Sequence, residues 1–154
     1  MTADGGELLP VLLVGHGPLA AGLLGAVEMI AGPQERCAVV RLRPEDDIER
    51  VSKRLEAELR RMGVADDDDG LIFADLFGAA PANAAAMLLR TRPNLEIVAG
   101  MNLPMVVDAL LSREGMSAKD LCRQALASGQ ESIRDVGAVV RAALAGSNTA
   151  GADT

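Results

Sequence analysis

Residues 10–17 have the sequence PVLLVGHG, an apolar run that ends in the chain's single histidine, held between two glycines. A short apolar run bounded by glycine is typical of a buried β-strand. The amphipathic segment that follows predicts a helix, which places His16 at the carboxyl end of a strand. Open α/β sheets bind their ligands at that end. His16 is therefore a candidate functional residue, and the alternative is a histidine that only satisfies its hydrogen bonds in a turn.

The alternation of strand and helix continues along the chain. Apolar stretches predict strands over residues 8–14, 36–42, 70–75 and 95–99. Helices are expected over residues 18–31, 44–62, 81–90, 104–112 and 118–128, with Pro44 and Pro81 in first turns, Ser117 as a cap and Gly129 as a stop. Residues 131–140 fit either a short strand or a helix. This order predicts an α/β fold, a doubly wound and mainly parallel sheet with helices on both faces and right-handed crossovers.

The length of 154 residues, without an internal repeat or a linker, predicts one domain. We expect it over residues 8–145, with a flexible leader over 1–7 and a disordered polar tail over 146–154. The formal net charge of −7 argues against general nucleic-acid binding. No apolar run reaches the roughly 20 residues of a membrane span, so no direct membrane insertion is expected. Cys37 and Cys122 lack CxxC spacing and are expected as buried, reduced thiols of a cytoplasmic protein.

Three segments meet at the carboxyl edge of the expected sheet, namely His16, Asp75 and the loop over residues 100–102. If the first and third strands are neighbours, as in common doubly wound orders, His16 lies beside Asp75. A carboxylate that accepts the Nδ1 hydrogen of an imidazole fixes the tautomer and leaves Nε2 free as a base, a ligand or a nucleophile. The alternative for Asp75 is a turn or capping acid.

The expected surroundings of this pair favour an anion. Helices that start at Pro18 and Pro81 would direct free backbone N–H groups toward the same edge. Such groups can hold a phosphoryl group on Nε2 of His16 without a lysine or a metal ion. Asn83 either adds a side-chain donor or is simply a polar residue of a first helical turn.

Other chemistries lack their sequence signatures. The segment 78–83 has no GK[ST] ending of a P-loop, and the turn after the first strand lacks the three glycines of a dinucleotide site. A GxSxG elbow is absent, and a receiver domain needs acids where His16 stands. One histidine and two distant cysteines make no zinc site. Residues 66–69, four aspartates, lack calcium-ligand spacing and are expected as a solvated turn. We therefore expect neither a metal ion nor a cofactor.

Three motifs in order resemble one known family. They are LVGHG at residues 13–17, DLFGAAPAN at residues 75–83 and VAGMNLPM at residues 98–105. Together they resemble the EIIA component of the mannose/fructose/sorbose family of the bacterial phosphoenolpyruvate-dependent sugar phosphotransferase system (PTS). The resemblance extends over about residues 9–135 and implies the flavodoxin-like, doubly wound fold of that family.

The resemblance also implies a phosphotransferase with a phosphohistidine intermediate. By motif position, His16 takes the phosphoryl group at Nε2 from phospho-HPr, and Asp75 orients the ring. The group then passes to an EIIB partner, which works with the membrane components EIIC and EIID in sugar transport. The family usually forms a homodimer by exchanging a C-terminal strand, for which residues 131–137 are the candidate here.

Further residues are assigned around this pair. The candidate phosphate-binding residues are Gly17, Gly78, Ala79, Ala80 and Asn83. The candidate partner contacts are Leu76, Phe77, Met101 and Met105, each of which fits the core equally well.

The family motif usually has glycine and then a hydroxyl residue where this chain has Ala79 and Ala80. The chain therefore lacks one side-chain donor, a hydrogen bond worth roughly 0.5–1.5 kcal/mol when neutral. Two related alternatives stay open, a regulatory EIIA-like module controlled by His16 phosphorylation and a phosphotransfer subunit of a dihydroxyacetone kinase. An unrelated hydrolase or a structural α/β domain is favoured if His16 lies away from Asp75.

Overall fold

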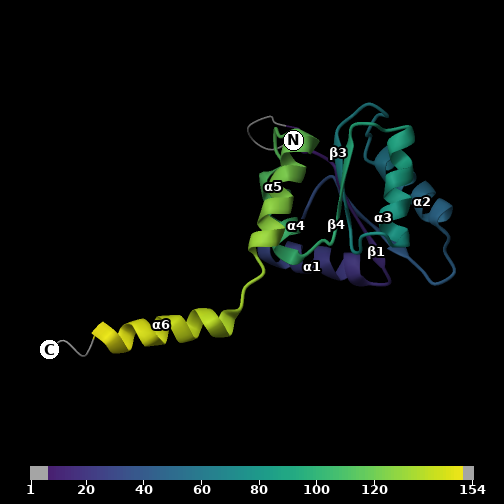
Figure 1. The fold of residues 1–154 in the computed structure, drawn as a ribbon. Coiled ribbons are helices and arrows are strands. Elements are labelled where there is room, and N and C mark those ends of the chain that lie inside the picture. Colours follow the sequence, from purple (N-terminus) through teal and green to yellow (C-terminus); the bar gives the residue numbers. More distant parts are fainter. Residues whose placement is uncertain (1–6, 151–154) are drawn as a thin grey trace.

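The computed structural model describes residues 7–150, and its centre is a four-stranded sheet (Figure 1). The strands are β1 (Val11–His16), β2 (Cys37–Leu42), β3 (Gly70–Ala74) and β4 (Leu95–Ala99). Their order across the sheet is β2-β1-β3-β4, and every pairing is parallel. All four carboxyl ends therefore lie along one edge, with β1 and β3 as neighbours in the centre.

Helices cover both faces of the sheet. They are α1 (Leu19–Ala31), α2 (Ile48–Arg61), α3 (Ala80–Met87), η1 (Leu88–Arg90, a short 3-10 helix), α4 (Leu103–Ser112) and α5 (Ala118–Glu131). A further helix, α6 (Val136–Ala150), lies apart from the sheet. One buried cluster joins α1, α4 and α5 to one face, and a second joins α2 and α3 to the other. Figure 1 shows these two layers on opposite sides of the sheet. The predicted doubly wound α/β fold is confirmed.

Alternation along β1 shows how one strand serves both layers. Val11 and Leu13 belong to the cluster under α1, α4 and α5, whereas Leu12 and Val14 belong to the cluster under α2 and α3. All four side chains are fully buried. Since consecutive side chains of a strand point to opposite faces, a strand covered on both sides needs a continuous apolar run.

Two elements, α2 and β1, begin later in the chain than the sequence predicts. α2 begins at Ile48 rather than near Pro44, because the Asp47 side chain caps it by accepting a hydrogen bond from the Arg50 N–H at 2.7 Å. The first strand begins at Val11 rather than at residue 8, since the parallel pairing with both neighbouring strands starts there.

The C-terminal segment is helical where the sequence left a strand open. α5 passes through the buried Gly129, which is therefore no stop, and ends at Glu131. Since α6 begins at Val136, the candidate exchange strand over 131–137 is not formed in the single chain. α6 extends away from the body (Figure 1).

The predicted tail and leader fall partly outside the described residues. Residues 146–150 continue α6 rather than forming the disordered tail that their polar composition predicts, because the alanine-rich turns before them favour a helix. The predicted leader residues 1–6 and tail residues 151–154 lie outside the described part of the chain.

Candidate functional site

The histidine and the aspartate singled out in the sequence are in direct contact. His16 is the last residue of β1, and Asp75 directly follows β3, the neighbouring strand. His16 Nδ1 lies 2.8 Å from Asp75 Oδ2, and the backbone N–H of His16 donates to the same oxygen at 2.8 Å. Because the paired strands end side by side, the sheet itself brings these two residues together.

This contact defines the state of the imidazole ring. An ionised aspartate only accepts hydrogen bonds, so Nδ1 carries the ring proton and Nε2 of the neutral ring keeps a free lone pair. The side chain of His16 is 48% exposed, whereas that of Asp75 is 6% exposed. The ring that would react is thus accessible, while the group that orients it is held inside. The second carboxylate oxygen, Asp75 Oδ1, is buried and has no hydrogen-bond partner among the described residues.

Three of the predicted phosphate-binding residues already use a donor, and one of them is Ala79, whose backbone N–H donates to Leu76 O at 3.4 Å. The Gly17 N–H donates to Leu42 O at 2.9 Å, which continues the pairing between β1 and β2. The Asn83 side chain donates through Nδ2 to Gly78 O at 3.3 Å and so closes the loop before α3. The Gly17 N–H is therefore not free in this structure, whereas the Asn83 amide has a second N–H that these bonds leave unused.

The start of α3 supplies backbone donors instead. Gly78 turns the chain from β3 toward the helix with a φ of 76°, a conformation that favours glycine. Ala79 is the N-cap and makes no side-chain capping bond. The first backbone bond of the helix runs from the Asn83 N–H to Ala79 O at 3.0 Å, so the N–H groups of Ala80 and Ala82 precede the hydrogen-bonded ladder. An anion at this helix end would also meet the positive end of the helix dipole.

The predicted partner contacts divide between surface and core. Leu76 and Phe77, which directly follow Asp75 in the sequence, are 58% and 88% exposed. Met101 and Met105 are only 8% and 4% exposed and belong to the core under α1, α4 and α5. Both methionines are thus core residues in this structure, and Met105, which lies in α4, packs against α5 at Gly129.

One exposed apolar residue near the site was missed in the sequence. Leu19 opens α1 three residues after His16 and is 50% exposed. Its place in the apolar stripe of the helix predicts burial, and only its position in the first turn, beyond the sheet edge, would have indicated exposure. We call Leu19, Leu76 and Phe77 the apolar collar of His16, since these exposed residues lie within three positions of His16 or Asp75 in the sequence.

Neither metal chemistry nor thiol chemistry has a centre among the described residues. No three His, Cys, Asp or Glu side chains of the described part are placed to hold a metal ion. Both cysteines are free. Burial raises the pKa of the Cys37 thiol to about 11 and also raises the pKa of Cys122, so both thiols stay protonated near neutral pH. No helix in residues 7–150 combines the length and apolar character that crossing a membrane requires.

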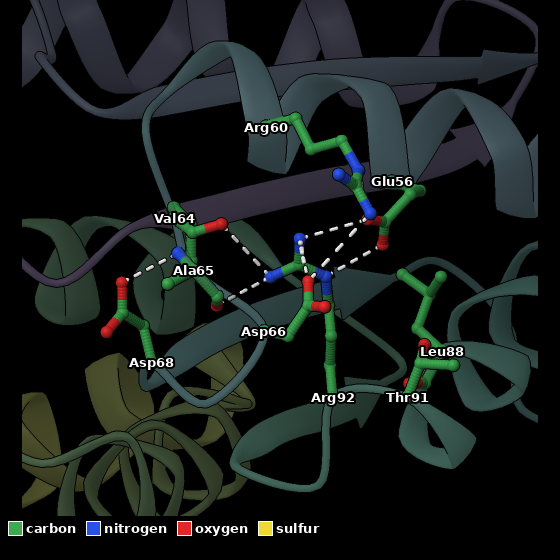
Figure 2. A network of polar contacts seen from close by, with 9 residues as sticks. All are labelled: Glu56, Arg60, Val64, Ala65, Asp66, Asp68, Leu88, Thr91 and Arg92. Carbon is green, nitrogen blue, oxygen red and sulfur yellow. Dashed lines mark hydrogen bonds and ion pairs between the residues drawn. The ribbon is translucent and has the colours of Figure 1, made fainter.

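A second charged cluster lies away from the histidine and is shown in Figure 2. Arg92, which is 1% exposed, donates to both carboxylate oxygens of Glu56 at 2.7 and 3.0 Å and pairs with Asp66 at 3.1 Å. It also donates to the backbone oxygens of Val64 and Ala65 at 3.2 and 2.7 Å. These bonds fasten the loop between α2 and β3 to the segment before β4.

The predicted aspartate turn takes part in similar hydrogen bonding. Asp68 accepts from the Ala65 N–H at 2.7 Å, and Asp69 accepts from the Ala118 N–H at 2.8 Å where α5 begins. Asp66, Asp67 and Asp68 are exposed. The solvated turn predicted over 66–69 is confirmed for these three residues.

Comparison with known proteins gives the same family from sequence and from fold. The sequence model of the family "EIIA-man: PTS system fructose IIA component" matches residues 10–126. The mannose-specific EIIAB component of Escherichia coli K12 is 30% identical over 128 residues, which cover 82% of this chain but 39% of that protein. The fructose-specific EIIA component of Bacillus subtilis is 27% identical over 127 residues, covering 82% of this chain and 86% of that one.

Solved structures agree. The mannose/sorbose-specific IIA subunit of Enterococcus faecalis superposes with a TM-score of 0.76 at 30% identity, covering 84% of this chain and 96% of that chain. The EIIA component of Streptococcus agalactiae gives a TM-score of 0.77 at 28% identity, covering 85% and 99%. The chain thus spans about two-fifths of the E. coli relative and nearly all of these two structures.

Proposed function

The chain belongs to the mannose/fructose/sorbose EIIA family of the PTS, and on that premise we propose that it is a phosphoryl carrier. His16 accepts the phosphoryl group on Nε2 from phospho-HPr and passes it to an EIIB protein, which serves sugar uptake with EIIC and EIID. This transfer takes place in the cytoplasm. The observation that carries the proposal is the 2.8 Å contact between Nδ1 of the half-exposed His16 and Oδ2 of the buried Asp75.

The transfer step uses the free lone pair of the ring. Nε2 of neutral His16 attacks the phosphorus of the donor's phosphohistidine. A P–N bond forms at His16 while the donor's P–N bond breaks, and the donor imidazole leaves with that electron pair. The His16 ring keeps its proton at Nδ1 and gains positive charge, which the adjacent carboxylate of Asp75 offsets. Because the donor is already activated, the step calls for no nucleotide.

The start of α3 is the proposed cradle for the phosphoryl oxygens. The N–H groups of Ala80 and Ala82 lie ahead of the helix ladder, and the helix dipole favours negative charge there. Neither Ala79 nor Ala80 has a hydroxyl, so these donors are backbone groups alone. We expect the phosphorylated form to be shorter-lived than in a variant with an added hydroxyl, Ala80→Ser.

The first test is phosphorylation of the purified chain with phosphoenolpyruvate, enzyme I and HPr, followed by intact mass. We expect an acid-labile gain of one phosphoryl group in the wild type and none in His16→Ala. Since His16 is the only histidine, the variant removes every possible phosphohistidine. No gain in a folded wild type, with the relay verified on a control acceptor, would refute the carrier proposal.

A second candidate function is regulatory, and alanine at position 80, where the family motif usually has a hydroxyl residue, favours it. In that case phosphorylation of His16 changes the binding of a partner protein instead of feeding a sugar permease. Mixing the phosphorylated protein with EIIB proteins of the same cell distinguishes transport from regulation. Loss of the label to an EIIB protein supports transport, whereas a label that stays on His16 and alters binding of another protein supports regulation.

We also propose a homodimer, which covers the exposed apolar face of α6. Four side chains at helical spacing form this face and are 69%, 59%, 49% and 61% exposed, in the order Val136, Val139, Val140 and Leu144. A contiguous apolar face of this kind is rare on a monomer. Light scattering on the full chain should give a dimer, and Val140→Asp with Leu144→Asp should give a monomer. A wild-type monomer at about 100 μM would refute the dimer.

A further inference from the structure

Gly15, the residue before the histidine, lies against the aspartate that orients it. A Cβ atom at position 15 would stand 3.2 Å from Asp75 Oδ2, 3.3 Å from its Cγ and 3.4 Å from its Cβ. The first two distances are shorter than ordinary van der Waals contact between a carbon and its neighbours. The missing side chain of Gly15 therefore makes room for one particular group, the carboxylate of Asp75.

The backbone of Gly15 gives no other reason for glycine. Gly17 and Gly78, which flank the site, adopt positive φ values of 54° and 76° that side chains disfavour. Gly15 is not among the residues with positive φ; it lies inside β1, paired with Arg41 of β2, in an ordinary strand conformation. An alanine would fit this backbone, so the space taken by Asp75 is what a side chain at position 15 would disturb.

The bonding of Asp75 is one-sided. Oδ2 accepts both the backbone N–H and Nδ1 of His16 at 2.8 Å each. Oδ1 is buried and accepts nothing among the described residues. A buried carboxylate oxygen without a donor keeps its charge uncompensated, and this charge is available to a cation next to it. The phosphorylated His16 ring would be that cation.

We propose that Gly15 is a positioning residue of the transfer site. By lacking a side chain it leaves the space in which Asp75 places one oxygen against both the backbone and the ring of His16. This inference deepens the proposed function and rests on it for the reaction, but its structural part concerns only the resting ring. A side chain at Gly15 would push Oδ2 by a few tenths of an ångström and lengthen both bonds at once.

The test uses Gly15→Ala, with Gly25→Ala as the matched control. A Cβ at Gly25, an exposed glycine of α1, meets no atom within 4 Å. Because His16 is the only histidine, the ¹⁵N signals of its ring do not overlap with others and report the tautomer of this one side chain. We expect the wild type and Gly25→Ala to hold the Nδ1–H tautomer, and Gly15→Ala to give a mixture. The rate of phosphorylation by phospho-HPr should fall about tenfold in Gly15→Ala, with its KM for phospho-HPr unchanged.

Asp75→Ala provides the second arm, since it removes the carboxylate that the new methyl group meets. If Gly15 acts through Asp75, adding Gly15→Ala to Asp75→Ala changes neither the tautomer nor the rate further. A further loss in that background would overturn the proposal, as would a Gly15→Ala protein with the wild-type tautomer and rate. If Gly15→Ala alone does not fold, the double variant should fold, and a double variant that also fails to fold would overturn it.

The two proposals fail in different ways. The tautomer measurement needs no phosphoryl donor, so it stands even when the wild type takes up no phosphate. In that case the carrier function is refuted, whereas a shifted tautomer in Gly15→Ala still shows that Gly15 positions Asp75 against the ring.

Discussion

The protein holds two buried charged groups in opposite ways. Arg92 is 1% exposed and each of its nitrogens donates, to Glu56, Asp66 and two backbone oxygens (Figure 2). Asp75 is 6% exposed, yet one of its oxygens takes two bonds and the other takes none. In the Arg92 cluster every nitrogen of the guanidinium has a partner, whereas the His16–Asp75 pair leaves one buried carboxylate oxygen without a partner among the described residues.

The difference separates a structural role from a chemical one. In a fully satisfied network every donor and acceptor is already paired on folding, so no polar group remains to bind a ligand. A pair with an uncompensated oxygen and a half-exposed ring still has bonding capacity when a phosphoryl group adds positive charge to that ring. Substitutions confined to one region at a time should therefore separate an effect on stability from an effect on transfer.

The largest effect is expected from Arg92→Met, which leaves Glu56 with a carboxylate that has lost two bonds and leaves two backbone oxygens unpaired. Breaking a buried ion pair in this way should lower the free energy of unfolding by about 3 kcal/mol. Urea unfolding followed by circular dichroism measures it. The folded fraction should still be phosphorylated at His16. A loss under about 1 kcal/mol would remove the structural role given to the cluster.

Asp75→Asn should have the next largest effect, and on rate rather than on stability. Asparagine keeps an oxygen that can accept from His16 but loses the charge that offsets the phosphorylated ring. We expect phosphorylation by phospho-HPr to slow roughly 100-fold and the free energy of unfolding to change by about 1 kcal/mol or less. Asp67→Asn, on the exposed aspartate turn, is the matched control and should leave the rate unchanged. Equal rates in the two variants would contradict the role of Asp75.

The fold could be predicted from the sequence because its signals are local. The apolar run at 11–14 and the helix periodicities on either side of each strand determine the alternation, and alternation determines a parallel sheet. Errors came where a tertiary contact overrides a local rule. Gly129 looks like a helix stop, but it lies inside α5, and a Cβ atom at this position would stand 2.4 Å from Cε of Met105. The glycine therefore serves the packing of α5 against Met105 and does not end the helix.

The site was predictable in its central pair and less so around it. The contact between His16 and Asp75 could be predicted because each residue stands at the end of a strand and the two strands are neighbours in the sheet. Which N–H groups are free to bind a ligand depends on hydrogen bonds between distant segments, and the sequence does not show these bonds. The Gly17 N–H donates to Leu42 O, and one N–H of the Asn83 amide donates to Gly78 O. The closeness of Gly15 to Asp75 also depends on side-chain packing between two strands.

A smaller effect is expected from Phe77→Ala in the apolar collar of His16. Phe77 is 88% exposed, so its truncation removes almost no core packing and should leave stability unchanged. If a protein donor docks on this collar, the KM for phospho-HPr should rise about tenfold at constant kcat, because an exposed aromatic side chain is a typical anchor at interfaces. Met29→Ala, at a side chain that is 90% exposed on α1, is the control and should change nothing. Unchanged KM in Phe77→Ala would place the docking surface elsewhere.

The smallest expected effect is on how the free energy of unfolding depends on acidic pH. The hydrogen bonds from Arg92 hold the pKa of Glu56 below its usual value of 4.5 in the folded state, against the opposing effect of burial. A depressed pKa contributes stability that is complete above the unfolded value and is lost as the pH falls through the folded one. The free energy of unfolding should therefore decrease below about pH 4.5, and Glu56→Gln should make this decrease shallower.

The acid-dependent part that remains in Glu56→Gln has its own source. The pKa of Asp46 is lowered as well, chiefly by the backbone N–H of Arg43, so Glu56→Gln should flatten the profile only in part. Urea titrations at a series of pH values between about 7 and 3 measure both contributions. Parallel profiles for wild type and Glu56→Gln would mean that Arg92 stabilises the fold through its backbone bonds rather than through charge. The Arg92 cluster would then stabilise the fold through hydrogen bonds to backbone oxygens. Its difference from the His16–Asp75 pair would lie in hydrogen-bond satisfaction and not in charge.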